Sequence, residues 1–241
     1  MANRLVVDEI SKAFHKRKVV ERVSMVLETS RVIGLLGPNG AGKTTSFYMV
    51  VGLLKPDSGA LLLDDHDITS LTLPQRAHLG ISYLPQEASV FRKLTIADNL
   101  LAIIQTLGLT RAEEQARLDE MLAQFGLEKI RNNMAYTVSG GERRRVEIAR
   151  ALVLNPKFIL LDEPFAGIDP LAVSDIQEII SRLKAQGIGV LISDHNVRET
   201  LGICDYAYIM DQGSILEEGN PQSVIASPKA REIYLGEDFR L

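Results

Sequence analysis

The 241-residue sequence predicts an α/β fold in which a mainly parallel core sheet carries an antiparallel β part and an inserted helical part. Four apolar runs have the length and continuous hydrophobicity of strands buried on both faces of a parallel sheet, namely residues 32–36, 158–161, 189–192 and 207–210. Helical stretches separate these runs, as in a doubly wound sheet. The first 30 residues instead alternate apolar and polar side chains, which indicates short antiparallel strands with one solvated face.

A mainly helical block interrupts the predicted core between residues 95 and 127. Thr110 and Glu113 have capping-box spacing, in which each side chain satisfies a backbone amide at a helix start. A later helix is expected to begin at Asp169 and Pro170, an N-cap acid followed by the residue best tolerated in the first turn. We expect the block to form a sub-lobe.

The expected organisation is one domain, residues 1–241, because no Pro/Gly/Ser-rich linker or internal repeat divides the chain. Its expected parts are a catalytic core of residues 1–94 and 128–225, the helical sub-lobe of residues 95–127, and a C-terminal tail of residues 226–241.

Composition and charge exclude several classes of protein. Apolar residues are 46% and charged residues 24%, which excludes disordered and fibrous chains. The net charge of −4 gives no electrostatic footprint for nucleic acid, and we expect the basic runs 16–18 and 143–145 to be solvated. The single Cys204 and the lack of a signal-like N-terminus favour the cytoplasm. No stretch of about 18 apolar residues occurs, so a membrane role requires a partner.

The decisive motif is a glycine-rich run after the first apolar strand, with two glycines separated by four residues and followed by Lys and Thr. Such a loop closes backbone N–H groups around phosphate oxygens, and the following helix, expected over residues 46–51, adds its positive end. Lys43 would place a charge on the outer phosphates, and the Thr44 hydroxyl suits Mg²⁺. The residues expected to bind nucleotide are Gly37, Pro38, Asn39, Gly40, Ala41, Gly42, Lys43, Thr44 and Thr45.

Two acids, Asp162 and Glu163, end the second apolar run. Alone, such a pair is often a solvated loop. After a phosphate loop it indicates a metal-side aspartate, Asp162, and a second carboxylate, Glu163, placed to orient or deprotonate a water that attacks the γ-phosphate. The sequence therefore predicts hydrolysis of a nucleoside triphosphate.

A second candidate anion site is Ser139-Gly140-Gly141-Glu142, before a helical stretch. The Ser and Glu have capping-box spacing, so one interpretation is simply a helix start. Two consecutive glycines at a helix start cost backbone entropy, which a phosphate approaching the backbone would explain. Both interpretations stay open at this point.

These motifs resemble those of the ATP-binding subunits of ABC transporters, and the resemblance covers essentially the whole chain. The ordered matches are the phosphate loop, Gln86 in Leu84-Pro85-Gln86, the Ser139–Glu142 signature, Asp162-Glu163, the loop of residues 166–169, and His195. The signature departs from the family pattern at Val138 and Glu142, and Phe14 stands where tyrosine is common. The resemblance implies a P-loop NTPase of the ABC type that uses ATP and Mg²⁺.

The resemblance also implies individual roles. Phe14 matches the aromatic that stacks on adenine, Gln86 the residue that reaches Mg²⁺ and the attacking water, and His195 the switch histidine at the γ-phosphate. Residues 139–142 would bind the ATP held by a second copy of the chain. The family therefore implies a homodimer with two ATP molecules between its subunits.

The segment after Gln86 places the apolar pair Val90 and Phe91 beside the cations Arg92 and Lys93. From the residues alone, Val90 and Phe91 fit core positions. In the family this region lines the groove that receives a membrane subunit, which makes Phe91 and Arg92 the candidates for coupling to a partner.

A finer resemblance is to the ATPase subunits of lipopolysaccharide export systems, and it is carried by residues 84–92, 139–150, 194–200 and 234–241. It implies that the chain powers lipopolysaccharide extraction from the inner membrane and export to the outer membrane. The implied partners are two transmembrane permease subunits of the LptF and LptG kind. The implied location is peripheral, on the cytoplasmic face of the inner membrane.

Two alternatives remain. ATPase subunits of branched-chain amino-acid importers are similar through the cassette, although the Glu-Arg-Arg-Arg run and the Asp-Phe-Arg-Leu ending argue against them. A soluble ABC ATPase acting on nucleic acid or the ribosome is the other, and the single cassette, negative charge and lack of a heptad insertion disfavour it.

Overall fold

The computed structural model describes residues 2–167 and 169–240, so Ile168 of the 166–169 loop and the terminal Leu241 lie outside the described residues. Its core sheet has the strand order β10-β9-β3-β8-β7-β6. These strands are β3 (Val32–Leu36), β6 (Ile81–Leu84), β7 (Phe158–Asp162), β8 (Gly189–Ser193), β9 (Tyr206–Asp211) and β10 (Ser214–Gly219). Every neighbouring pair is parallel except the β9–β10 hairpin. The four predicted core strands and the mainly parallel sheet are confirmed.

A second sheet is antiparallel throughout and has the order β2-β1-β4-β5. Its strands are β1 (Arg4–Phe14), β2 (Arg17–Glu28), β4 (Ser58–Leu63) and β5 (His66–Asp67). The predicted alternation is present, but β1 and β2 have 11 and 12 residues and are not short. Register shifts let both strands continue while they bend, with φ near 48° at Glu9 and Arg22.

The helix after the glycine-rich loop, α1 (Lys43–Val51), packs between the two sheets. Its Phe47, Met49 and Val50 share one buried cluster with Leu5 of β1 and Leu35 of β3. This burial on both sides fixes the axis of α1 relative to the core sheet.

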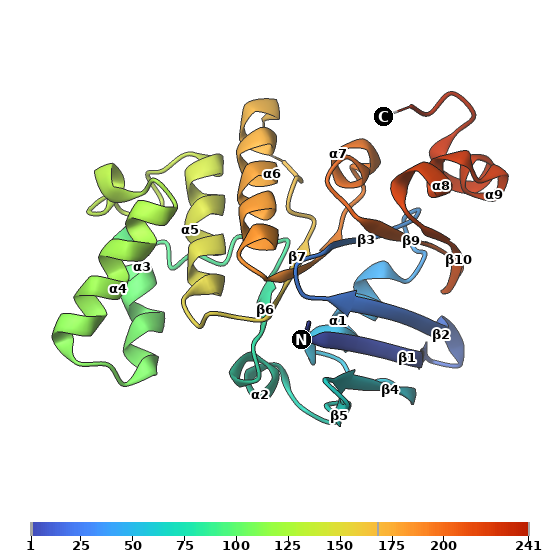
Figure 1. Cartoon of the computed structure of the whole chain (residues 1–241), viewed down its shortest axis with the longest axis horizontal. Helices are drawn as coiled ribbons and strands as arrows, with labels where there is room; N and C mark the ends of the chain where they lie inside the picture. The colour runs from blue at the N-terminus through green and yellow to red at the C-terminus, as the bar shows by residue number, and fades with distance from the viewer. Residues whose placement is uncertain (1, 168, 241) are drawn as a thin grey trace.

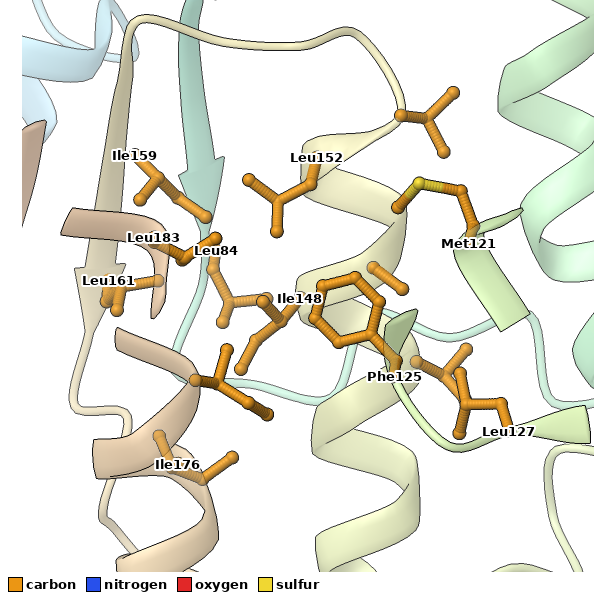
Figure 2. Close-up of a cluster of buried hydrophobic side chains, with 14 of the residues drawn as sticks. Leu84, Met121, Phe125, Leu127, Ile148, Leu152, Ile159, Leu161, Ile176 and Leu183 are labelled. Atoms are coloured by element: carbon orange, nitrogen blue, oxygen red, sulfur yellow. The ribbon is translucent and has the colours of Figure 1, made fainter. Parts of the chain in front are cut away.

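The predicted helical block contains α3 (Ile96–Ile104) and α4 (Arg111–Gln124), and lies at the end of the molecule remote from the antiparallel sheet (Figure 1). The predicted capping box at Thr110 and Glu113 is confirmed. Figure 2 shows how this block joins the core: Met121 and Phe125 lie on one side of the helix α5 (Gly140–Leu152), and Leu84 of the sheet lies next to Ile148 on its other side. The boundaries of the sub-lobe stay a prediction.

The remaining helices cover the sheet and its edge. They are α2 (Leu73–His78), α6 (Pro170–Ala185), α7 (Val197–Leu201), α8 (Pro221–Ala226) and α9 (Pro228–Ala230), followed by a π-helical turn over Arg231–Leu235. Asp169 caps α6 as predicted, by accepting a hydrogen bond from the Ala172 N–H. Tyr234 and Phe239 pack on a buried cluster beside β9. Within the described residues, no helix has the length and hydrophobicity to cross a membrane.

Arg76 of α2 is fully buried against the C-terminal end of α1. Its Nη1 donates to the carbonyl oxygens of Met49 (2.7 Å) and Val50 (2.6 Å), and its other nitrogens donate to those of Leu71 and Thr69. Burial lowers the pKa of Arg76 to about 10. A cation here satisfies carbonyls that a helix end leaves without partners and complements the helix dipole.

We expect Arg76→Ala to lower the free energy of unfolding by about 3 kcal/mol, because it orphans several buried carbonyl oxygens and leaves a cavity. Urea unfolding would measure the change. Arg111→Ala, at an exposed arginine of α4, is the control and should change stability by less than about 0.5 kcal/mol. Equal stabilities of the two variants would contradict the assignment.

Candidate functional site

Four parallel strands end at the same edge of the core sheet. β3, β8, β7 and β6 are consecutive neighbours and run in one direction, so the residues that follow them gather at one edge, where ligands bind in open α/β sheets. The residues that follow are Gly37 after β3, Gln86 after β6, Glu163 after β7, and Asp194 and His195 after β8.

The loop after β3 requires glycine. Gly37, Gly40 and Gly42 have φ values of 147°, 80° and 101°, a region that L residues rarely adopt. A Cβ on Gly37 would lie 2.1 Å from the Met210 carbonyl oxygen in β9, and a Cβ on Gly42 would lie 2.7 Å from the Val19 carbonyl oxygen in β2. The loop therefore passes directly against two strands.

Helix α1 begins at Lys43, three residues earlier than predicted, because the left-handed Gly42 ends the loop and is the N-cap. Lys43, Thr44 and Thr45 consequently form the first turn, and Thr44 is exposed there. Thr44 is therefore accessible at the edge of the sheet.

The Lys43 ammonium lies over the same loop. Its Nζ donates to the carbonyl oxygens of Gly37 (2.7 Å) and Pro38 (2.9 Å). Burial lowers the pKa of Lys43, and the nearby carboxylates, Glu163 and Asp162 foremost, act in the opposite direction. Lys43 is thus a charge held between the loop and the carboxylates.

A cavity of about 430 Å³ opens beside the loop and is lined by residues 17–19, 38–41 and 211–213. Of these segments, only residues 38–41 belong to the nucleotide-binding motif predicted from the sequence. The other two segments are distant from it in the sequence and come close to it only in the folded chain. Phe14, at the end of β1, is 44% exposed and is not part of this lining. Its ring centroid lies 5.9 Å from Lys12 Nζ.

Asp162 is buried at the end of β7, with 3% of its surface exposed. Burial, and then the negative charge of Glu163, raise the pKa of Asp162 to about 6. The Tyr83 hydroxyl, 3.4 Å away, donates to Oδ2. A cation beside a buried carboxylate with a raised pKa would stabilise its charged form. The oxygens of Asp162, Thr44 and Gln86 are the hard donors that Mg²⁺ takes.

Glu163, Gln86 and His195, the residues predicted to be catalytic, come together. Gln86 Nε2 donates to Glu163 Oε2 at 2.7 Å. His195 Nδ1 lies 3.2 Å from the same oxygen. One carboxylate oxygen therefore joins the ends of β6, β7 and β8.

Ser139 and Glu142 form the predicted capping box at the start of α5. The Ser139 hydroxyl accepts from the Glu142 N–H (3.2 Å), and the Glu142 carboxylate accepts from the Ser139 N–H (2.9 Å). This backbone hydrogen bond holds the pKa of Glu142 below its usual value. Gly140 is exposed beside them and borders a small pocket that also contacts Gln86 and Glu163.

The expectation that the basic run 143–145 is solvated is wrong for Arg144. Only 6% of the surface of Arg144 is exposed. Its Nη1 donates to the Pro85 carbonyl (3.0 Å) and to Glu147 Oε2 (3.1 Å), and its Nη2 donates to the Asp162 carbonyl (3.3 Å). Glu147 also accepts from the Ser89 N–H. This buried pair connects α5 to β7 and to the segment after β6.

The structure separates the apolar pair after Gln86. Val90 is buried, whereas Phe91 is 47% exposed. The Arg150 guanidinium lies over the Phe91 ring, 4.5 Å from its centroid, and Arg92 is exposed beside it. Phe91 and Arg92 are thus both available at the surface.

Comparison with known proteins identifies the class. Residues 20–166 match the family described as ABC transporter, and this chain belongs to that family. The lipopolysaccharide export system ATP-binding protein LptB of Acidithiobacillus ferridurans is 53% identical over 241 residues, the full length of both chains. LptB of Escherichia coli K12 is also 53% identical, over 98% of this chain and 99% of its own.

Solved structures of ATP-binding cassettes have the same fold as this chain. An ATP-binding cassette of an ABC transporter in its ADP conformation has a TM-score of 0.87 and 32% identity, over 98% of this chain and 99% of its own. A nucleotide-free ATP-binding cassette gives 0.87 and 31%, over 98% of this chain and 100% of its own. The chain is therefore an ATP-binding subunit with ATPase activity, as its sequence predicted.

We expect Asp162→Asn to stabilise the isolated chain in a pH-dependent manner. The folded chain raises the pKa of Asp162 to about 6, so it holds the proton more tightly than the unfolded chain does. Ionisation therefore opposes folding, and this opposition grows between about pH 4 and pH 6. The variant should be more stable than wild type by about 2–3 kcal/mol at pH 7.5, with little difference at pH 4.

Urea unfolding across this pH range provides the measurement. Asp57→Asn is the control, because a hydrogen bond from Lys12 lowers the pKa of Asp57 and predicts the opposite sign. A stability difference for Asp162→Asn that does not vary with pH would contradict the prediction.

Proposed function

We propose that this chain is the ATP-hydrolysing subunit of an ABC transporter that extracts lipopolysaccharide from the inner membrane and exports it to the outer membrane. The observation that carries the proposal is the 53% identity to LptB proteins, which extends over the full length of both chains. Membership of the ABC transporter family is compatible with many transported substrates. The identity to LptB is more specific, because it also covers the segments outside the nucleotide-binding motifs.

Nucleotide binding is assigned to the loop and to the start of α1. Backbone N–H groups of residues 37–45, except Pro38, which has none, enclose the phosphates. Lys43 exchanges its bonds to loop carbonyls for phosphate oxygens. Phe14 stacks on the adenine through its exposed ring. Thr44, Gln86 and Asp162 are the proposed holders of Mg²⁺, which neutralises charge on the β- and γ-phosphates.

Hydrolysis is assigned to the cluster at Glu163. Its carboxylate orients a water and accepts its proton, Gln86 holds that carboxylate from the side of β6, and His195 contacts the γ-phosphate from the side of β8. Because Gln86 and His195 both contact Glu163, displacement of either one by the nucleotide changes the position of the base.

The partner of the site is a second copy of the chain. The capping box uses the N–H groups of Ser139 and Glu142. Within residues 139–142, the first-turn N–H groups of the exposed Gly140 and of Gly141 are therefore the ones assigned to bind the γ-phosphate of an ATP held by the loop of that copy. Two ATP molecules are then enclosed in a homodimer that is stable only while the γ-phosphates are present.

The membrane partners are assigned to the surface around Phe91 and Arg92. We propose two transmembrane subunits of the LptF and LptG kind, which place this chain at the cytoplasmic face of the inner membrane. Arg150 holds the Phe91 ring from beneath, so the exposed face of that ring can enter an apolar contact while Arg92 supplies a charge at its rim.

Glu163→Gln should lower kcat for ATP hydrolysis by about 10²- to 10⁴-fold, because the water loses its base. The affinity for ATP should stay within about twofold, since the loop and Lys43 are unchanged. Steady-state hydrolysis and equilibrium ATP binding measure the two effects. Glu87→Gln, at an exposed neighbouring glutamate, is the matched control, and unaltered hydrolysis by Glu163→Gln would refute the assignment.

Affinity purification of the tagged Glu163→Gln chain with ATP from detergent-solubilised membranes tests the transport function. We expect mass spectrometry to find two multi-span proteins of the lipopolysaccharide-export kind. Adding Phe91→Ala should reduce their recovery severalfold, whereas Leu53→Ala, which truncates a residue that is similarly exposed elsewhere, should not. A permease pair with a second, different cassette would indicate an amino-acid importer, and ribosomal or DNA-repair proteins would refute transport.

A further inference from the structure

The turn after β7 holds Glu163 in a backbone conformation that costs free energy. Its φ is 44°, in the left-handed region where a residue other than glycine is strained. Two hydrogen bonds that the turn donates to acceptors at the end of β8 fix its conformation. The Glu163 N–H donates to the Ser193 carbonyl (2.6 Å), and the Phe165 N–H donates to Asp194 Oδ2 (3.1 Å).

Asp194 contacts both loops that carry the proposed chemistry. Its side chain is fully buried. While Oδ2 accepts from Phe165 after β7, Oδ1 accepts from the Asn196 N–H (2.8 Å) after β8 and lies 3.6 Å from His195 Nδ1. Backbone N–H groups that donate to a carboxylate make charge-assisted bonds, which are stronger than neutral ones.

We propose that Asp194 is a positioning residue for hydrolysis. It does not touch the nucleotide; it ties the Glu163 turn to the His195 loop, so that the Glu163 carboxylate keeps its orientation toward the attacking water. The proposal rests on the role assigned to Glu163 under the proposed function. Asp194 begins the segment 194–200 that carries the finer resemblance, but the sequence assigns it no role, because its partners are backbone groups on two different loops.

Asp194→Asn is the informative substitution because the amide has the same shape and only one acceptor oxygen. Its NH₂ group must face one of the two backbone donors, at Phe165 or Asn196, so one bond is lost. Loss of a charge-assisted bond of this kind corresponds to about a tenfold to hundredfold fall in kcat if the bond is needed for the reactive geometry. KM for ATP should stay within about twofold, since the phosphate loop is unchanged.

Asp205→Asn is the matched control. Asp205 Oδ2 accepts a hydrogen bond from the Val32 N–H (2.9 Å) at the start of β3, the opposite edge of the sheet, and Oδ1 pairs with Lys184. Both substitutions remove a carboxylate that accepts a backbone N–H. Only the Asp194 variant should change kcat, whereas either can lower the melting temperature.

The experiment measures kcat, KM, ATP affinity and melting temperature for the full chain with Asp194→Asn, Glu163→Gln, both together, and Asp205→Asn. If Asp194 acts through Glu163, the double variant will have the kcat of Glu163→Gln. Once the Glu163 carboxylate is absent, the substitution of Asp194 can no longer lower kcat by misplacing it. A further tenfold fall in the double variant, or a wild-type kcat for Asp194→Asn, would overturn the proposal.

The outcomes separate this inference from the proposed function. A wild-type kcat for Asp194→Asn beside an inactive Glu163→Gln refutes only the positioning role. Failure to recover export-type membrane subunits refutes the transport function and leaves the kinetic result intact. A fall in ATP affinity that equals the fall in kcat would assign Asp194 to general folding of the site and would also overturn the proposal.

Discussion

The close passage of the Gly37 backbone against β9 is the constraint on which the site depends. A Cβ at this position would lie 2.1 Å from the Met210 carbonyl oxygen, so no side chain can stand between the loop and the strand. Because the backbone can pass so close to β9, the chain leads from β3 into α1 within residues 37–42. The close passage also directs the first turn of α1, with Lys43 and Thr44, toward the ends of the neighbouring strands.

The buried charges of the site are arranged around that edge and depend on one another. Lys43 is held by loop carbonyls, Asp194 by backbone N–H groups, and Arg144 by Glu147. Asp162 differs, because burial raises its pKa and its described side-chain contact is the hydroxyl of Tyr83. The site thus combines charges that are already satisfied with one that is suited to gain a cation.

Motifs that are contiguous in the sequence were predictable because their physics is local. The glycine-rich loop, the capping boxes at Thr110 and Ser139, and the apolar core strands each follow from neighbouring residues. Arg76 and Asp194 were not predictable from pattern. A buried arginine that bonds to helix carbonyls, or an aspartate that bonds to amides of a separate loop, carries no signature in its own neighbourhood.

Arg76 has a consequence for where α1 can unravel. Its guanidinium occupies the carbonyl groups of Met49 and Val50, which are the groups that water must reach for a helix to fray from its C-terminal end. Water cannot reach these carbonyl groups, so we expect α1 to open first at Lys43. Amide hydrogens should then exchange fastest in the turn beside the glycine loop and slowest at the Arg76 end, so the mobile end of the helix is the end that receives phosphate.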